Sequence, residues 1–263
     1  MPLLTRGAVV PDESLLVGRK PVLEALTGRA GEVEKVWIQR GAGGSAISEI
    51  HRLARTAGIP VQFLPRQGLD RLAPGVRHQG VAARASAVAF HILEDMLRAI
   101  ASNPDEVRAR RPILLLLDGI QDPRNLGAIL RSAAGAAVSG VIVSSRGTAP
   151  INSPAVKASA GAAARLPIAR VDDMSQTAED LKERGYWIIG ADSGSAASAW
   201  DTDLGRPIGL VIGSEGRGIS RALASACDEL VHIPMPGEVE SLNVSVAAGI
   251  LLFSAVRART EQR

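Results

Sequence analysis

The sequence is poor in cysteine and in aromatic residues. It has one cysteine, Cys227, in 263 residues, and Phe, Trp and Tyr together make up only 3% of the chain. One cysteine excludes a disulfide framework and a cysteine-based metal site, and it favours a reducing, cytoplasmic setting. We expect Cys227 to be a small buried residue. The scattered aromatic residues form no stacking platform of the kind that single-strand binders use.

Several other signals are absent. No apolar run approaches the ~20 residues of a membrane span, and the longest, Ala133–Val143, is broken by glycine and serine. The start of the chain, MPLLTRG, has no pattern of a secretory signal. The four histidines lack metal-ligand spacing. The motifs G-x-G-x-x-G, Walker A and G-x-S-x-G are missing, which counts against a dehydrogenase, a P-loop enzyme and a serine hydrolase. We expect no membrane segment and no metal.

The charge is unevenly distributed along the chain. Residues 1–86 hold 12 Lys/Arg against 7 Asp/Glu, which gives a net charge of +5. Residues 87–263 hold 18 against 20, which gives a net charge of −2. A basic excess in the first third suits a polyanionic partner such as nucleic acid. A mildly basic, solvated face accounts for the same numbers.

Periodicity predicts a small α/β domain over residues 15–86, after a flexible segment at 1–14. Apolar positions and Gly/Pro breaks alternate between strand and helix patterns in this stretch. The expected helices are Gly18–Leu26 and Ser45–Ala57, and the expected strands are Val33–Ile38, Val61–Leu64 and one beginning at Gly80–Ala83. The polar, partly helical stretch 87–111 is expected to link this domain to a second one.

The second domain, residues 112–263, opens with the five apolar residues Ile113–Leu117, as expected of a strand covered on both faces. Strands separated by helices of ~10 residues predict a mostly parallel sheet. The further expected strands are Gly140–Val143, Leu166–Ile168, Trp187–Ile189, Leu210–Ile212 and Leu230–Ile233. The expected helices are Leu126–Ala137, Pro154–Ala164, Gln176–Arg184, Ser220–Ala226 and Val244–Arg259.

Three turns in this domain carry polar side chains: Asp118–Gly127, Gly213–Gly218 and Pro234–Asn243. Each follows an apolar run and precedes a helical pattern, which places it at the carboxyl end of a strand. That edge is where open α/β sheets bind ligands. The three turns therefore predict one shared site.

Each polar residue in the turns also has a simpler role. Asn125 stands where a helix N-cap belongs, and Arg131 lies on the following helix about 125° from its apolar face, where it is either solvated or at the rim of the site. Glu215 is either an exposed loop acid or an acceptor for backbone amides or an arginine. Ser241 and Asn243 are either caps of the last helix or part of the site.

Together, the turns resemble the three motifs of the SpoU (TrmH-like) branch of the SPOUT methyltransferases, and the first domain resembles the L30e-like substrate domain found in members of that family. The stretches that carry the resemblance are Leu117–Ser132, Leu210–Gly218, Ile233–Met235, Ser241–Ala247, Gly18, Pro21–Leu26 and Val76–Val81.

The resemblance implies an α/β fold with a mostly parallel sheet and a deep trefoil knot in the second domain, although knots are otherwise nearly absent from proteins. It also implies a homodimer with the last helix in the interface and a site completed by the second subunit. S-adenosylmethionine is the implied cofactor, held by the backbone around Ala191, Gly213, Ile233, Met235 and Leu242.

The implied reaction is 2′-O-methylation of a ribose in RNA, with catalytic residues Asn125, Arg131, Glu215, Ser241 and Asn243. The resemblance implies that Arg131 accepts the proton with help from the substrate phosphate. Free arginine, with a pKa above ~12, is a poor base, so a phosphate clamp that also stabilises the developing alkoxide is the physically preferred role of Arg131.

The implied substrate is a guanosine in the peptidyl-transferase loop of 23S rRNA. The alternatives are a tRNA, another rRNA position, or a non-catalytic RNA-binding protein on the same scaffold. The expected RNA contacts are Arg19, Lys20, Arg77 and His78.

Overall fold

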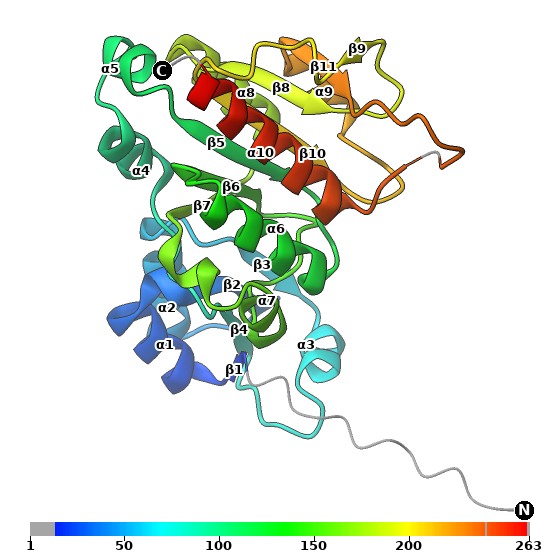
Figure 1. The fold of residues 1–263 in the computed structure, drawn as a ribbon. Helices are drawn as coiled ribbons and strands as arrows, with labels where there is room; N and C mark the ends of the chain where they lie inside the picture. The colour runs from blue at the N-terminus through cyan, green and yellow to red at the C-terminus, as the bar shows by residue number, and fades with distance from the viewer. Residues whose placement is uncertain (1–13, 240, 262–263) are drawn as a thin grey trace, which may run out of the picture. The chain divides into compact units, whose positions relative to one another are not determined.

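The protein consists of two compact units, and the boundary between them in the chain follows Ser86. Its structure is a computed structural model that describes residues 14–239 and 241–261 (Figure 1). The flexible segment expected at 1–14 lies, apart from Ser14, outside the described residues. Within the described part of the chain, no helix combines the length and apolar character needed to cross a membrane.

The first unit is a four-stranded mixed sheet with helices on both faces. Its elements are β1 (Leu15–Val17), α1 (Arg19–Gly28), a 3₁₀ turn (Ala30–Glu32), β2 (Val33–Gln39), α2 (Ser45–Thr56), β3 (Val61–Leu64), α3 (Arg66–Leu72) and β4 (Val81–Ala85). The strand order is β1-β4-β2-β3, with β2 and β3 parallel and β4 antiparallel to both β1 and β2. The apolar sides of α1 and α2 cover one face, and α3 covers the other through Leu69 against Trp37.

The second unit is a seven-stranded parallel sheet with helices on both faces. Its strands are β5 (Ile113–Asp118), β6 (Gly140–Ser144), β7 (Ile168–Val171), β8 (Trp187–Ala191), β9 (Ala197–Ser198), β10 (Ile208–Gly213) and β11 (Glu229–His232). Its helices are α4 (Leu93–Ile100), α5 (Pro104–Arg110), α6 (Pro123–Gly135), α7 (Ser153–Ala158), a 3₁₀ turn (Ala162–Arg165), α8 (Met174–Glu183), α9 (Arg221–Ala226) and α10 (Val244–Glu261).

The strand order β7-β6-β5-β10-β8-β11-β9 puts β5 and β10 at the centre, and neighbouring strands in this order pair in parallel. Alternate residues of β5 point to opposite faces. Leu115 and Leu117 pack with α6 and α10, whereas Leu114 and Leu116 pack with α4, α8 and α9. This confirms the mostly parallel sheet. The trefoil knot stays a prediction, because strand order alone does not establish how the chain is threaded.

Residues 87–111, the partly helical stretch expected to link the domains, contain two helices. They belong to the second unit and form α4 and α5. Met96, Leu97 and Val107 are at most 3% exposed and pack into the core beneath the sheet. The polar residues that suggested a linker lie on the outer sides of two amphipathic helices.

Other differences from the expected elements are local. β1 and α3 were not predicted, because each is short and α3 reads as a polar stretch, RQGLDRL. The helix expected over Pro154–Ala164 breaks into α7 and a 3₁₀ turn, because Ala160 and Gly161 both adopt positive φ. A left-handed residue stops the α-helical hydrogen-bond ladder.

Helices α6 and α10 lie side by side on one face of the sheet (Figure 1). Arg259, near the end of α10, anchors it by donating to the backbone carbonyls of Leu204, Arg206 and Arg111. Burial lowers the pKa of Arg259 to about 10, so the guanidinium remains charged at neutral pH. These bonds tie the carboxyl end of α10 to the segments that precede β5 and β10.

Gly127 of α6 marks a close approach between α6 and α7. A Cβ at this position would lie 2.4 Å from the carbonyl oxygen of Ala155 and 2.6 Å from the Cβ of Ala158. We expect Gly127→Ala to lower the free energy of unfolding by about 3 kcal/mol, because helices in a packed core do not separate without cost.

Thermal and urea unfolding measure this change. Gly135→Ala is the matched control on the same helix, since its nearest new contact, Phe253 Cζ, is at an ordinary 3.5 Å. A Gly127→Ala protein as stable as Gly135→Ala would show that the two helices shift apart freely.

Candidate active site

A cavity of about 870 Å³ opens at the carboxyl edge of the parallel sheet, where β8, β10 and β11 end. Its lining includes all five residues that the sequence assigned to cofactor binding, Ala191, Gly213, Ile233, Met235 and Leu242, and three of the expected catalytic residues, Glu215, Ser241 and Asn243. Its size is that of a pocket for a ligand of a few dozen atoms. The lining mixes apolar side chains with loop backbone.

The loop after β10 is built on glycine. A Cβ on Gly213 would lie 2.1 Å from the carbonyl carbon of Gly218, and Ser214 and Gly218 exchange two backbone hydrogen bonds of 3.0 and 2.9 Å. Gly216 and Gly218 have φ of 80° and 65°, a region that other residues rarely adopt. This tight turn places Glu215 at its tip.

Three predicted residues meet in one polar cluster. The Nδ2 of Asn125 donates to Glu215 Oε1 at 2.9 Å. The Nδ2 of Asn243 donates to the same oxygen at 2.8 Å and to Asn125 Oδ1 at 3.2 Å. We call Asn125, Glu215 and Asn243 the Asn–Glu–Asn cluster. Its members come from the first turn of α6 and from the loops after β10 and β11, so the three polar segments meet at this edge of the sheet.

The helix caps correct one of the simpler readings. Asn125 does not cap α6, because Asp122 does so by accepting from the Arg124 amide at 2.7 Å. The side chain of Asn125 is therefore available to Glu215. Asn243 has both roles. Its Oδ1 accepts from the Ser245 amide at 2.9 Å and its Nδ2 faces the other two members.

Arg131 and Ser241 lie near the cluster in the chain but not in it. Arg131 is exposed on α6, and no hydrogen bond or ion pair holds it within residues 14–239 and 241–261. It lies six residues beyond Asn125 on the same helix. Ser241 is exposed and lines the cavity. Both side chains are free to meet a ligand.

Sequence reasoning missed two supporting residues. Asp118, at the end of β5, accepts from the Ser220 amide at 2.9 Å and so ties the end of β5 to the start of α9. Ser245 donates its hydroxyl to Asn243 Oδ1 at 2.6 Å, which fixes the orientation of that amide. Both occur within the quoted motifs, but the partner of Asp118 lies 102 residues away in the chain, and periodicity does not reveal either contact.

His232 falls within the expected strand Leu230–Ile233. It lies in β11 and also lines the cavity, and its Nδ1 is buried without a hydrogen-bond partner among the described residues. A buried, unpaired nitrogen is a ready partner for a polar ligand atom.

Cys227 is not a reactive thiol. It packs against the core cluster beneath the sheet and donates to the Leu223 carbonyl at 3.3 Å. Burial raises the pKa of its thiol to about 12, so the thiolate is scarce at neutral pH. Within the described ranges, no group of three or more His, Cys, Asp and Glu side chains is arranged to hold a metal ion.

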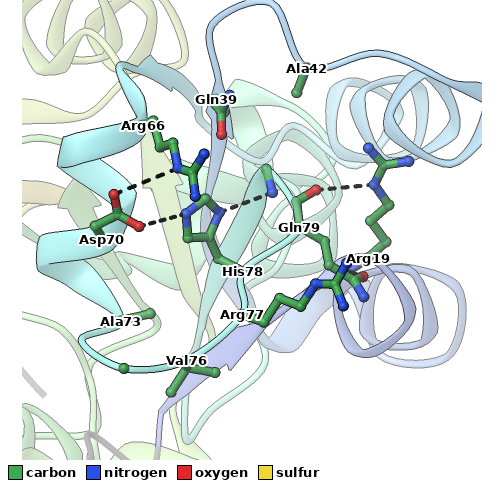
Figure 2. Close-up of a pocket in the computed structure, with 12 residues that line it drawn as sticks. Arg19, Gln39, Ala42, Arg66, Asp70, Ala73, Val76, Arg77, His78 and Gln79 are labelled. Atoms are coloured by element: carbon green, nitrogen blue, oxygen red, sulfur yellow. Dashed lines mark hydrogen bonds and ion pairs between the residues drawn. The ribbon is translucent and has the colours of Figure 1, made fainter.

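The first unit has a cavity of its own at one edge of its sheet (Figure 2). Of the four expected RNA contacts, Arg19, Arg77 and His78 line it. Lys20 does not, since its side chain is 87% exposed and lies 3.9 Å from Glu24. His78 is only 7% exposed.

A parallel sheet with helices on both faces, and with a cavity and a polar cluster at its carboxyl edge, defines an α/β protein that binds its ligand across strand ends. The chain belongs to the SpoU rRNA Methylase family. The model of that family matches residues 112–253, and a model described as RNA 2′-O ribose methyltransferase substrate binding matches residues 15–90.

Curated relatives cover nearly the whole chain. The 23S rRNA (guanosine-2′-O-)-methyltransferase RlmB of Xanthomonas axonopodis pv. citri is 43% identical over 93% of this chain and 96% of its own length. The putative TrmH family tRNA/rRNA methyltransferase YacO of Bacillus subtilis is 36% identical over 93% of this chain and 95% of its own length.

Among solved structures, the SpoU methyltransferase AviRb of Streptomyces viridochromogenes, in complex with the cofactor AdoMet, is 26% identical with a TM-score of 0.58. That similarity covers 94% of this chain and 90% of AviRb.

Proposed function

We propose that this protein transfers a methyl group from S-adenosylmethionine to a ribose 2′-hydroxyl of 23S rRNA, at a guanosine of the peptidyl-transferase loop. The observation that carries the proposal is the Asn–Glu–Asn cluster, in which three distant turns meet beside the cavity. The named activity of the RlmB relative supports the rRNA guanosine, and the AdoMet complex of AviRb supports the cofactor. Because the proposed substrate is ribosomal RNA, we infer that the protein acts in the cytoplasm.

The cavity fits the proposed cofactor. Its volume of about 870 Å³ accommodates a nucleoside joined to an amino acid, and Ile233, Met235 and Leu242 supply apolar walls. The unpaired Nδ1 of His232 and the loop backbone supply hydrogen-bond partners. When bound, S-adenosylmethionine supplies an electrophilic methyl group, whose bond to sulfur breaks as its bond to the ribose oxygen forms.

The chain's own residues position the hydroxyl and stabilise its charge. Arg131 holds the substrate phosphate and stabilises the alkoxide that develops as the 2′-hydroxyl passes its proton to solvent. Asn125 and Glu215 orient the ribose and the guanidinium. Ser241 and Asn243 hold the nucleotide and the methionine end of the cofactor. Alignment of oxygen with methyl supplies much of the rate.

A homodimer is part of the proposal. Val246 and Phe253 of α10 are 49% and 50% exposed, and a spacing of seven residues puts both on the same side of the helix. An exposed apolar stripe on the last helix suits an interface with a second copy, and that copy completes the site around Arg131. In the first unit, Arg19, Lys20 and Arg77 provide RNA affinity, and His78 holds the loop that carries Arg77.

Two measurements test the function. Calorimetry is expected to give binding of S-adenosylmethionine and none of NAD. Transfer of a labelled methyl group to 23S rRNA transcripts, followed by mass-spectrometric mapping, is expected to mark one guanosine ribose. Methylation of tRNA, or of another rRNA position, would contradict the proposed substrate but not the type of reaction. RNA binding without transfer would leave a non-catalytic protein.

A further inference from the structure

Four chain segments converge on one edge of the sheet in the first unit. The carboxyl ends of β1, β2 and β3 lie there together with the amino end of β4, because β4 runs antiparallel to β1 and β2. Arg19 follows β1, Arg66 follows β3, and Arg77 precedes β4. All three line a cavity of about 870 Å³, which Figure 2 shows.

The charged side chains that line this cavity are mostly positive. Its lining contains three arginines and one acid, Asp70. Both carboxylate oxygens of Asp70 already face partners, since Oδ1 lies 3.0 Å from His78 Nε2 and Oδ2 lies 3.9 Å from Arg66 Nε. Within the described chain, Arg77 has no side-chain partner, and Arg19 uses only its Nε, which donates to the Gln79 carbonyl at 3.1 Å. The cavity therefore presents unpaired guanidinium groups.

The backbone adds to this positive potential. α1 and α2 both begin after a glycine with φ of 101°, Gly18 and Gly44, with neither a capping side chain nor an acid in the first turn. A Cβ on Gly44 would lie 3.4 Å from Arg19 Nη1, so the start of α2 is beside Arg19. Helix amino ends with free N–H groups favour anions.

The loop that carries Arg77 is held in one conformation. His78 Nδ1 accepts from the Gly80 amide at 2.9 Å, so the ring proton is on Nε2 and is donated to Asp70. Gln79 and Gly80 have positive φ of 52° and 83°. His78, predicted from the sequence as an RNA contact, is 7% exposed with both ring nitrogens in use, so it is a positioning residue for this loop.

The composition of the lining selects the ligand. It contains three guanidinium groups and the amides of Gln39 and Gln79, but no Phe, Trp or Tyr. Guanidinium groups pair with phosphate oxygens in a bidentate fashion, whereas base recognition in single strands uses aromatic stacking. We propose that this edge clamps the phosphodiester backbone of the substrate RNA through Arg19, Arg66 and Arg77, without reading the bases. The identity of the RNA rests on the proposed function.

The test uses the full-length protein, 23S rRNA transcripts and a series of salt concentrations. Each lost phosphate contact lowers the slope of log affinity against log salt by about 0.7 for single-stranded RNA. The variant Arg19→Gln/Arg66→Gln/Arg77→Gln is therefore expected to bind more weakly, with a slope smaller by about 2. Arg55→Gln is the matched control, because Arg55 is exposed in the last turn of α2, away from the amino end.

A second variant keeps the test decisive if the triple variant does not fold. Asp70→Asn retains an oxygen that accepts from His78 and removes the one negative charge of the lining. We expect RNA affinity to rise about threefold, which a merely structural role of Asp70 does not produce. An unchanged salt slope in the folded triple variant, or no gain in Asp70→Asn, overturns the clamp.

Two further readouts separate this inference from the proposed function. The arginine variants are expected to raise the KM for rRNA and to leave kcat and the affinity for S-adenosylmethionine unchanged. If the unmodified protein methylates no 23S rRNA, the proposed function fails, whereas the salt slopes still decide whether the cavity holds an RNA backbone.

Discussion

Arg131→Ala is expected to lower methyl transfer by at least about 10²–10³-fold while S-adenosylmethionine still binds. Cofactor binding is expected to survive because Arg131 does not line the cofactor cavity. Its side chain projects from α6, six residues beyond Asn125. Removing one preorganised donor that stabilises developing negative charge has effects of this size. Single-turnover transfer of a labelled methyl group measures the rate, and calorimetry measures cofactor affinity.

The conservative variant separates two roles of this residue. Arg131→Lys keeps the charge but loses the planar fork, so a phosphate clamp predicts partial recovery relative to Arg131→Ala. Arg108→Ala is the control, since Arg108 is exposed on α5 and pairs with Asp105. Turnover near the unmodified rate in Arg131→Ala would remove this residue from the mechanism.

Glu215→Ala is expected to lower kcat/KM by about 10²-fold with little loss of stability. Glu215 Oε1 is the common acceptor of both amides in the Asn–Glu–Asn cluster, and its loss leaves Asn125 and Asn243 without a fixed orientation. The cluster is exposed, so each lost hydrogen bond changes the free energy of unfolding by only about 1 kcal/mol. Glu215→Gln keeps an acceptor oxygen, and its kcat/KM is expected to lie between those of Glu215→Ala and the unmodified protein.

Non-additivity tests whether the cluster acts as a unit. The double variant Asn125→Ala/Glu215→Ala is expected to be no slower than Glu215→Ala alone, because groups that act together lose their function together. Glu183→Ala, an exposed acid at the end of α8, is the control. Multiplicative losses would show that Asn125 and Glu215 act separately.

Some of the site was accessible from local sequence. The run Ile113–Leu117 predicts a buried central strand, and the structure gives β5 with that stretch fully enclosed. The polar turns after β5, β10 and β11 were placed at strand ends from the order of apolar run, turn and helix, and the structure has them at that edge.

Other features had no local signal. Arg66 was missed because it sits in a short polar helix, α3, that periodicity does not reveal. His78 was expected to contact RNA, and its polar neighbours in the chain give no sign that Asp70 and Gly80 hold its ring. Asn125 was given the cap of α6, which Asp122 occupies three residues earlier. In each case the partner depends on how the backbone turns in three dimensions.

The sequence by itself determined which segments are strands and helices, which turns carry polar groups, and which family the motifs resemble, because these follow from periodicity and from residues a few positions apart. Only the tertiary structure decided that Asn125 and Asn243 share one oxygen of Glu215, and that three arginines face one cavity in the first unit. Those contacts join residues that strand order and strand direction bring together, and neither order nor direction is encoded in any short stretch of chain.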